Sequence, residues 1–163
     1  HNVMNLMLAA TMAYKLGISL GEIEDAIINM KPIPHRLELI KSGNVNILDD
    51  TFNCNPQGAE CALNVLKEFD GRKIVLTPGM IELGDAEKSE NYLLGRKIAA
   101  VADRAILIGA NRTKPIYEGL ISGGFNEREI FIFETLEKAK SNFSALLGGG
   151  DTLLMLNDLP DNY

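Results

Sequence analysis

Cysteine is scarce in this chain, which contains only Cys54 and Cys61. Two cysteines cannot build the disulfide framework of a small secreted domain, and neither has neighbours at the spacing of zinc ligands. Cys54 would act as a nucleophile only beside a base, and the sequence places neither His1 nor His35 to serve as one. We therefore expect a protein of a reducing compartment, the cytoplasm, with no metal site and no catalytic thiol.

The chain also lacks an excess of basic charge and any long apolar run. Its net charge is −6, whereas a nucleic-acid-binding surface needs a basic face. No apolar stretch reaches the roughly 20 residues that cross a bilayer, and no signal peptide stands at the start. These absences predict a protein with no nucleic-acid partner and no membrane span.

Length and hydrophobic content favour a folded domain. The 163 residues are 46% hydrophobic, which is enough to bury a core in about one domain. The sequence starts within a helical pattern and stops just after a predicted strand. We therefore expect it to be a piece cut from a longer protein.

The chain begins with a helical pattern. Residues 2–17 form a mostly apolar helix, and Ser19 with Glu22 forms a capping box that starts a second helix. The prolines of the segment Lys31–Pro34 then stop the helix and make a stiff, extended linker. We place a domain boundary there, which gives a helical part over residues 1–33 and a second domain over residues 34–163.

After the boundary, strands and helices alternate regularly. The predicted strands are Leu37–Ile40, Val45–Asp49, Lys73–Thr77, Ala105–Gly109, Glu129–Phe133 and Thr152–Leu156. The predicted helices are Pro56–Phe69, Glu87–Val101, Lys114–Ile121 and Leu136–Leu147. Several strands are continuously apolar, as expected when helices cover both faces of a sheet. The pattern predicts an α/β fold with a doubly wound, mostly parallel six-stranded sheet, preceded by a short helical segment.

Two adjacent acids, Asp49 and Asp50, end one of these strands and lead into Thr51-Phe52-Asn53-Cys54-Asn55-Pro56. In open parallel sheets, ligands bind at the carboxyl ends of the strands. Two carboxylates at such a position lower stability unless a cation, a hydrogen-bond donor or a ligand meets them. The segment is therefore either the rim of a ligand site or an Asx turn that caps the next helix.

Further polar loops follow other strands. Gly79 and Gly84 bracket a long loop, which either offers backbone amides to a ligand or simply needs positive φ values. The cations of Asn111-Arg112-Thr113-Lys114 either bind a carboxylate or phosphate, or remain solvated. Asn157–Asp161 follows the last strand. The sequence alone leaves these alternatives open.

Three polar residues near the amino end have two interpretations each. Asn2 and Asn5 share one face of a helix, where their amides recognise a purine or face solvent. Arg36 can reach the acid pair or a nucleotide phosphate, or form a surface salt bridge.

Neither a G-x-x-x-x-G-K-S/T phosphate loop nor a G-x-G-x-x-G fingerprint is present. The residues alone thus indicate an α/β domain with a polar crevice.

Taken together, four segments resemble the Mur ligase family. His1-Asn2-Val3-Met4-Asn5 resembles the end of the central ATPase domain, and Pro34-His35-Arg36-Leu37-Glu38 resembles the hinge into the C-terminal domain. Asp49–Pro56 and Gly79–Gly84 are similar to the branch that adds D-alanyl-D-alanine to UDP-N-acetylmuramoyl-tripeptide. The resemblance covers the whole chain, but only the last part of a complete ligase.

The resemblance implies a ligase that joins a carboxylate to an amine through an acyl phosphate, with ATP and Mg²⁺ as cofactors. Both cofactors would need the central domain, so the resemblance implies that this fragment alone is inactive. The implied partners are UDP-N-acetylmuramoyl-tripeptide and D-alanyl-D-alanine. The implied cofactor-binding residues are Asn2, Asn5, Arg36 and Asp50. The implied substrate-binding residues are Asn53, Asn55, Gly79, Met80, Glu82 and Gly84, and no catalytic residue is assigned.

Two features differ from the usual pattern of this family. His35 stands where the hinge usually has glycine, and Thr77-Pro78 replaces a more usual Gly-Asp. One alternative is another ligase of the same superfamily, of the folylpolyglutamate type, the cyanophycin type or another Mur branch. The other is a non-catalytic α/β module that binds a nucleotide or a partner.

Overall fold

The computed structural model describes residues 2–31 and 33–157, with only the backbone of Asn2. Three predicted features lie outside the described residues: His1, Pro32 of the linker, and the part of the last polar loop beyond Asn157. Contacts between Cα atoms divide the chain into two compact units, residues 1–33 and 34–163.

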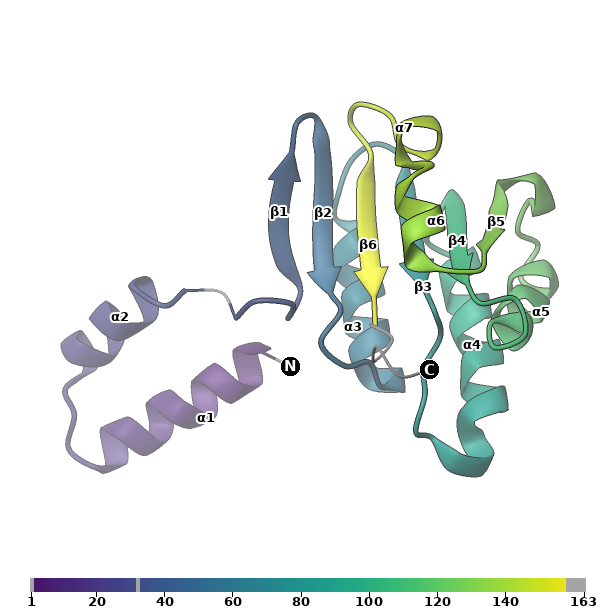
Figure 1. The fold of residues 1–163 in the computed structure, drawn as a ribbon. Helices are drawn as coiled ribbons and strands as arrows, with labels where there is room; N and C mark the ends of the chain where they lie inside the picture. The colour runs from purple at the N-terminus through teal and green to yellow at the C-terminus, as the bar shows by residue number, and fades with distance from the viewer. Residues whose placement is uncertain (1, 32, 158–163) are drawn as a thin grey trace. The chain divides into compact units, whose positions relative to one another are not determined.

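The helical unit consists of α1 (Asn2–Lys15) and α2 (Leu20–Ile28), shown in Figure 1. The predicted capping box is confirmed. The Glu22 backbone N–H donates to Ser19 Oγ at 3.3 Å, and the Ser19 backbone N–H donates to Glu22 Oε2 at 3.1 Å. These two bonds satisfy donors that the first turn of α2 leaves without partners within the helix.

The second unit contains a six-stranded sheet with the strand order β1-β2-β6-β3-β4-β5 (Figure 1). Its strands are β1 (Glu38–Ser42), β2 (Val45–Asp50), β3 (Lys73–Thr77), β4 (Arg104–Ile108), β5 (Ile130–Phe133) and β6 (Thr152–Leu156). β1 pairs antiparallel with β2, and the other neighbours pair in parallel. The predicted mostly parallel six-stranded sheet is confirmed.

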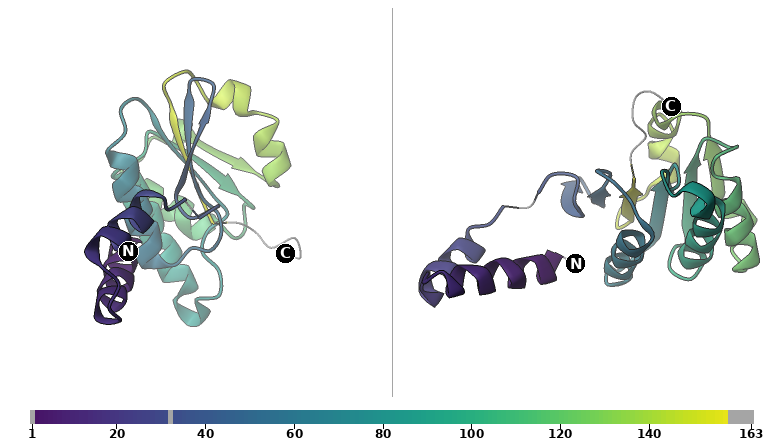
Figure 2. Two further views of the ribbon diagram at one scale, coloured as in Figure 1. Left: turned by 90° about the vertical axis from the view of Figure 1, so that its left-hand side faces the viewer. Right: turned by 90° about the horizontal axis from the view of Figure 1, so that it is seen from below.

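Helices cover both faces of this sheet (Figures 1 and 2). One face carries α3 (Pro56–Lys67), α4 (Glu87–Ala99) and α5 (Lys114–Ser122), and the other carries α6 (Leu136–Lys140) and α7 (Phe143–Leu146). Short 3₁₀ turns lie at Gly84–Ala86 and Glu127–Glu129. Alternate side chains of a strand point to opposite faces, so Val75 joins one core and Ile74 the other. Both faces are buried, which explains the continuously apolar strands.

Most predicted boundaries differ from the structure by one or two residues, and two of the differences have a clear local cause. The single helix expected over residues 136–147 is divided into α6 and α7. At the break, Ser141 Oγ donates to Glu137 O and Asn142 Nδ2 donates to Lys138 O, and such local bonds compete with the helix ladder. β1 starts at Glu38 rather than Leu37, because Leu37 has a φ of 55°, which a strand cannot adopt.

An ion pair at the amino edge of the sheet fixes the turn before β6. Arg72 Nη2 donates to Asp151 Oδ2 at 2.6 Å, and the same oxygen accepts the Gly148 backbone N–H at 2.6 Å. Burial raises the pKa of Asp151, but the bonds from Arg72 and Gly148 outweigh it and hold the pKa below its usual value. The charged form of Asp151 therefore stabilises the folded state.

We expect Asp151→Asn to lower the free energy of unfolding at pH 7 by about 1–3 kcal/mol, because two N–H groups of Arg72 and the Gly148 N–H lose a charged acceptor. Since the folded-state pKa is depressed, this contribution is present above the unfolded pKa of about 3.9 and is lost as the pH falls through the folded value. Urea denaturation at several pH values measures both effects. Glu60→Gln breaks an exposed pair with Lys97 and is the control that should change little. Equal stability of the Asp151→Asn and unaltered proteins at pH 7 would contradict this role.

Candidate functional site

The carboxyl ends of β2 and β3 lie at the same edge of the sheet, on either side of β6, because β6 pairs in parallel with both strands. Asp50 at the end of β2 pairs in register with Leu156 of β6. The next residue, Asn157, bridges the two sides. Its backbone N–H donates to Asp50 O at 3.1 Å, and its side-chain amide donates to Gly79 O at 2.7 Å. Strand pairing thus brings the acid segment beside the glycine-bracketed loop.

Asp49 has a structural role at this edge. Its Oδ1 accepts the Thr51 hydroxyl at 2.7 Å and the Thr51 backbone N–H at 3.2 Å. Its Oδ2 lies 2.9 Å from His35 Nδ1. Asp49 therefore forms an Asx turn, as one of the two interpretations of the acid pair expected, but this turn does not cap the next helix, whose N-cap is Asn55.

Asp50 is held by the segment that precedes β1. Burial raises the pKa of Asp50 above its usual value and outweighs the backbone bond from Leu37 and the charge of Arg36, which lower it. The charge of Asp49 adds to the rise. Only 8% of Asp50 is exposed, so the acid is more covered than a residue facing an open crevice. Such a carboxylate is stabilised when a further donor, such as a hydroxyl group, reaches it.

Arg36 and Phe52 lie on the same rim as Asp50. The guanidinium carbon of Arg36 is 4.0 Å from the centroid of the Phe52 ring. The Phe52 backbone N–H donates to His35 O at 3.2 Å, which ties the segment before β1 to the end of β2. The charge of Arg36 also lowers the pKa of Asp50, so the two groups share this rim, as one of the sequence interpretations proposed.

The polar residues after Phe52 have different environments. Asn55 is the N-cap of α3, and its Oδ1 accepts the Gly58 backbone N–H at 2.8 Å. Asn53 is exposed, so its side chain can meet a ligand. Cys54 between them is buried, and burial together with the charge of Asp50 raises its pKa to about 12. The thiol therefore stays protonated at neutral pH and is a poor nucleophile.

The loop after β3 has a buried anchor and an exposed tip. At Gly79, with a φ of 91°, a Cβ atom would lie 3.0 Å from Asn91 Oδ1. Met80 is buried, its N–H donates to Asn91 Oδ1 at 2.8 Å, and its carbonyl accepts Asn91 Nδ2 at 2.8 Å. Glu82 and Gly84 are exposed and have positive φ values of 63° and 54°. The tip is thus the part of this loop that presents side-chain and backbone groups to solvent.

Two asparagines that organise this edge were not predicted as site residues. Asn91 lies in α4, one turn before Leu94, and both residues are buried. A polar residue on the apolar face of a predicted helix was the signal for Asn91. Asn157 directly follows a continuously apolar strand. A polar residue at the end of an apolar strand is also the signal that identified the acids at the end of β2.

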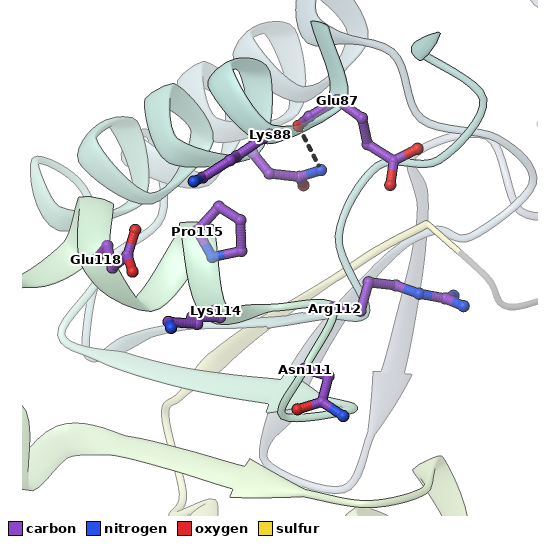
Figure 3. Close-up of a pocket in the computed structure, with 8 residues that line it drawn as sticks. Glu87, Lys88, Asn111, Arg112, Lys114, Pro115 and Glu118 are labelled. Atoms are coloured by element: carbon purple, nitrogen blue, oxygen red, sulfur yellow. Dashed lines mark hydrogen bonds between the residues drawn. The ribbon is translucent and has the colours of Figure 1, made fainter. Parts of the chain in front are cut away.

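A pocket of about 350 Å³ lies between the amino ends of α4 and α5 (Figure 3). It is lined by Glu87, Lys88, Asn91, Asn111, Arg112, Lys114, Pro115 and Glu118. Arg112 comes from the loop after β4 and Lys114 begins α5, and Figure 3 shows both at this pocket. Asn91 belongs both to the pocket and to the anchor of the neighbouring loop. The predicted cations therefore line a concave surface, where a carboxylate or phosphate can meet them.

The two amino-terminal asparagines belong to the helical unit. Asn2 begins α1, and Asn5 is exposed one turn later.

The described residues contain no group of three or more His, Cys, Asp or Glu side chains that could hold a metal ion. Over residues 2–31 and 33–157, no helix has the length and apolar character needed to cross a membrane.

Replacing Asn91 should loosen the loop after β3. We expect Asn91→Leu to lower the free energy of unfolding by about 1–3 kcal/mol, because the buried carbonyl of Met80 loses its donor. Hydrogen exchange at the Met80 amide should also become faster, since that N–H loses its acceptor. Asn64→Leu, at an exposed position of α3, is the control. Unchanged exchange at Met80 in the Asn91 variant would show that the anchor is not needed.

Sequence comparisons relate this chain to known ligases. Residues 35–156 match the family described as "Mur ligase, glutamate ligase domain". The UDP-N-acetylmuramoylalanine–D-glutamate ligase of Prochlorococcus marinus (strain MIT 9515) is 27% identical over 139 residues, which cover 85% of this chain and 27% of that protein. The UDP-N-acetylmuramoyl-tripeptide–D-alanyl-D-alanine ligase of Escherichia coli (strain K12) is 32% identical over 111 residues, which cover 67% of this chain and 25% of that protein.

Solved structures have the same fold. MurF from Acinetobacter baumannii superposes with a TM-score of 0.82 at 26% identity, over 96% of this chain and 34% of the other. The MurF ligase from Thermotoga maritima in complex with ADP gives a TM-score of 0.80 at 22% identity, with the same coverage. The chain therefore spans about a quarter to a third of the length of these proteins. The family match over most of the sheet-forming unit shows that this chain belongs to the Mur ligase family.

Proposed function

We propose that the chain is the C-terminal part of a cytoplasmic, ATP-dependent amide ligase of peptidoglycan-precursor synthesis. In this proposal the complete enzyme adds D-alanyl-D-alanine to UDP-N-acetylmuramoyl-tripeptide. The observation that carries the proposal is that one edge of the sheet holds an acid with a neighbouring arginine, Asp50 and Arg36, and a cation-lined pocket. Relatives that add D-alanyl-D-alanine support this branch.

The proposed reaction has two chemical steps. ATP phosphorylates the terminal carboxylate of the tripeptide, and the amine of the dipeptide then attacks the acyl phosphate. A tetrahedral intermediate forms, and phosphate leaves from it. The phosphate loop and the residues that hold Mg²⁺ belong to the central domain in this proposal. The residues of this chain contribute by positioning the reactants, which accounts for much of the catalysis in reactions of this kind.

The nucleotide would lie on the rim formed by Asp50 and Arg36. The poorly solvated Asp50 carboxylate accepts hydrogen bonds from the ribose hydroxyls, and these donors offset part of its burial. The Arg36 guanidinium meets phosphate oxygens. Asn5, with Asn2 beside it, contacts the adenine from the helical unit, because an amide both donates and accepts hydrogen bonds.

The dipeptide would enter the pocket between α4 and α5. Arg112 and Lys114 attract its terminal carboxylate, and the exposed side chain of Asn53 and the tip at Glu82 and Gly84 shape the entrance. Three other predicted substrate residues act indirectly by holding the backbone of this edge: Asn55, Gly79 and Met80.

Exposed apolar residues support the proposed domain boundary. Within the helical unit, Val3 is 68% exposed, Leu16 77% and Leu20 68%. So many large apolar side chains in water indicate a surface that packs against other protein. We assign residues 1–33 to the end of the central ATPase domain, whose remainder would cover these side chains, and residues 34–163 to the C-terminal domain.

A glutamate-adding ligase is the second candidate, because one such enzyme matches 85% of this chain. Phosphate release by the complete protein, with ATP and Mg²⁺ present, distinguishes the candidates. The proposal predicts release with UDP-N-acetylmuramoyl-tripeptide plus D-alanyl-D-alanine, and none when D-glutamate replaces the dipeptide. Activity only with UDP-N-acetylmuramoylalanine plus D-glutamate would assign the other branch. ATP binding without ligation of either amine would indicate a non-catalytic module.

Two substitutions in the complete protein should separate the two subsites. Asp50→Ala should raise the KM for ATP roughly tenfold, the effect of about 1.4 kcal/mol of binding energy, with little change in the KM for the dipeptide. Lys114→Ala should raise the KM for the dipeptide and leave that for ATP nearly unchanged. Steady-state kinetics with one substrate varied at a time measures both constants. Equal effects on both KM values in either variant would contradict the two-subsite arrangement.

A protein that consists only of residues 1–163 should show no ligase turnover. It lacks the phosphate loop that cradles ATP in P-loop enzymes, and this edge contributes only positioning groups in the proposal. Phosphate release by this fragment is measured with ATP, Mg²⁺ and both substrates, and the complete protein is the positive control. Turnover by the fragment would refute the proposed division of labour.

A further inference from the structure

We propose that Phe52 is a positioning residue, whose ring holds the Arg36 guanidinium beside Asp50 before any ligand binds. This inference deepens the proposed function and rests on it, because the orientation of Arg36 matters for catalysis only if this rim binds ATP. Phe52 itself needs no contact with the nucleotide in this role.

The Phe52 ring stacks on Arg36 and not on a hydrophobic core. The Arg36 guanidinium carbon lies 4.0 Å from its centroid, well within the about 6 Å over which a cation–π interaction is effective. Phe52 is 62% exposed and belongs to neither hydrophobic core of the sheet. Burial therefore does not account for a large aromatic side chain at this position, whereas the stacked guanidinium does.

The backbone on both sides of Arg36 is fixed. On one side, His35 O accepts the Phe52 N–H at 3.2 Å, and His35 Nδ1 lies 2.9 Å from Asp49 Oδ2. On the other side, the Leu37 backbone lies near enough to the Asp50 carboxylate to lower its pKa. His35 and Leu37 have φ values of 61° and 55°, which residues other than glycine rarely adopt, and these contacts hold them there. With its backbone set, Arg36 can vary only in its side chain.

Stacking on Phe52 lowers the side-chain entropy of Arg36 before a ligand binds. An exposed arginine samples many rotamers, and a ligand that needs one of them must restrict the rest. A ring that favours the stacked rotamer restricts the other rotamers before the ligand arrives. Such pre-organisation lowers the entropy cost of binding. Stacking occupies the flat face of the guanidinium and leaves the N–H groups at its edge for carboxylate or phosphate oxygens. Phe52 can thus orient Arg36 without blocking its hydrogen bonds.

A double-mutant cycle in the complete protein tests this role. Phe52→Leu should lower kcat/KM for ATP about two- to fivefold, the size of an exposed cation–π contact, and leave the KM for the dipeptide unchanged. Phe52→Tyr keeps the ring and should restore the value of the unaltered protein. In an Arg36→Ala background, Phe52→Leu should have no further effect. Ile121→Ala, at an exposed apolar position near the end of α5, is the control.

Several outcomes would overturn the inference. An equal loss in the Arg36→Ala background would mean that the ring acts on the ligand or on the fold, and not through Arg36. No loss in Phe52→Leu, or no rescue by tyrosine, would mean that stacking has no effect.

Nuclear magnetic resonance of the complete protein with ¹³C-labelled arginine separates this inference from the proposed function. A stacked ring should shift the Arg36 δ-methylene protons upfield, and Phe52→Leu should remove the shift. Absence of that shift overturns the inference whatever the activity. If the Arg36 protons show the upfield shift but the complete protein carries out no ATP-dependent ligation, the proposed function is refuted, and the inference with it.

Discussion

The position of β6 between β2 and β3 is the constraint on which the carboxyl edge of this sheet depends. Because β6 pairs in parallel with both neighbours, its first following residue, Asn157, reaches the end of β2 and the loop after β3 at once. Asn91 holds the same loop from α4 and also lines the pocket beside it. Hydrogen bonds from the side chains of Asn157 and Asn91, together with one backbone bond of Asn157, therefore couple the acid rim, the loop and the pocket into one surface, although these parts are distant in the sequence.

The two adjacent acids are equally buried but have different partners. Asp49 has local partners in Thr51 and His35, and it shapes the turn after β2. Asp50 has fewer compensating donors, and burial raises its pKa. The proposed function uses this difference, since an incompletely compensated acid gains most from ligand hydroxyls. In the same proposal, the exposed apolar residues of the helical unit pack against the rest of the central domain. The cation-lined pocket receives the dipeptide.

Local patterns were enough to predict the six strands, the helices on both faces and the acids at a strand end. Periodicity and capping depend on neighbouring residues, so they can be read along the chain. The strand order was not predicted, because the placement of β6 depends on pairing between segments far apart in sequence. The same limit applies to the site: the burial of Met80, the bonds of Asn91 and the contact between Leu37 and Asp50 all depend on distant partners. The break between α6 and α7 was missed for a local reason, since side chains at Ser141 and Asn142 compete with the helix.

The central claim is that the carboxyl edge of this sheet receives both a nucleotide and the incoming amine. A crystal structure of the complete protein with a non-hydrolysable ATP analogue and D-alanyl-D-alanine tests it most directly. The account predicts ribose hydroxyls within hydrogen-bond distance of the Asp50 carboxylate and the dipeptide carboxylate beside Arg112 and Lys114. A structure with both ligands bound away from this edge, and with Asp50 and the pocket unchanged, would contradict it.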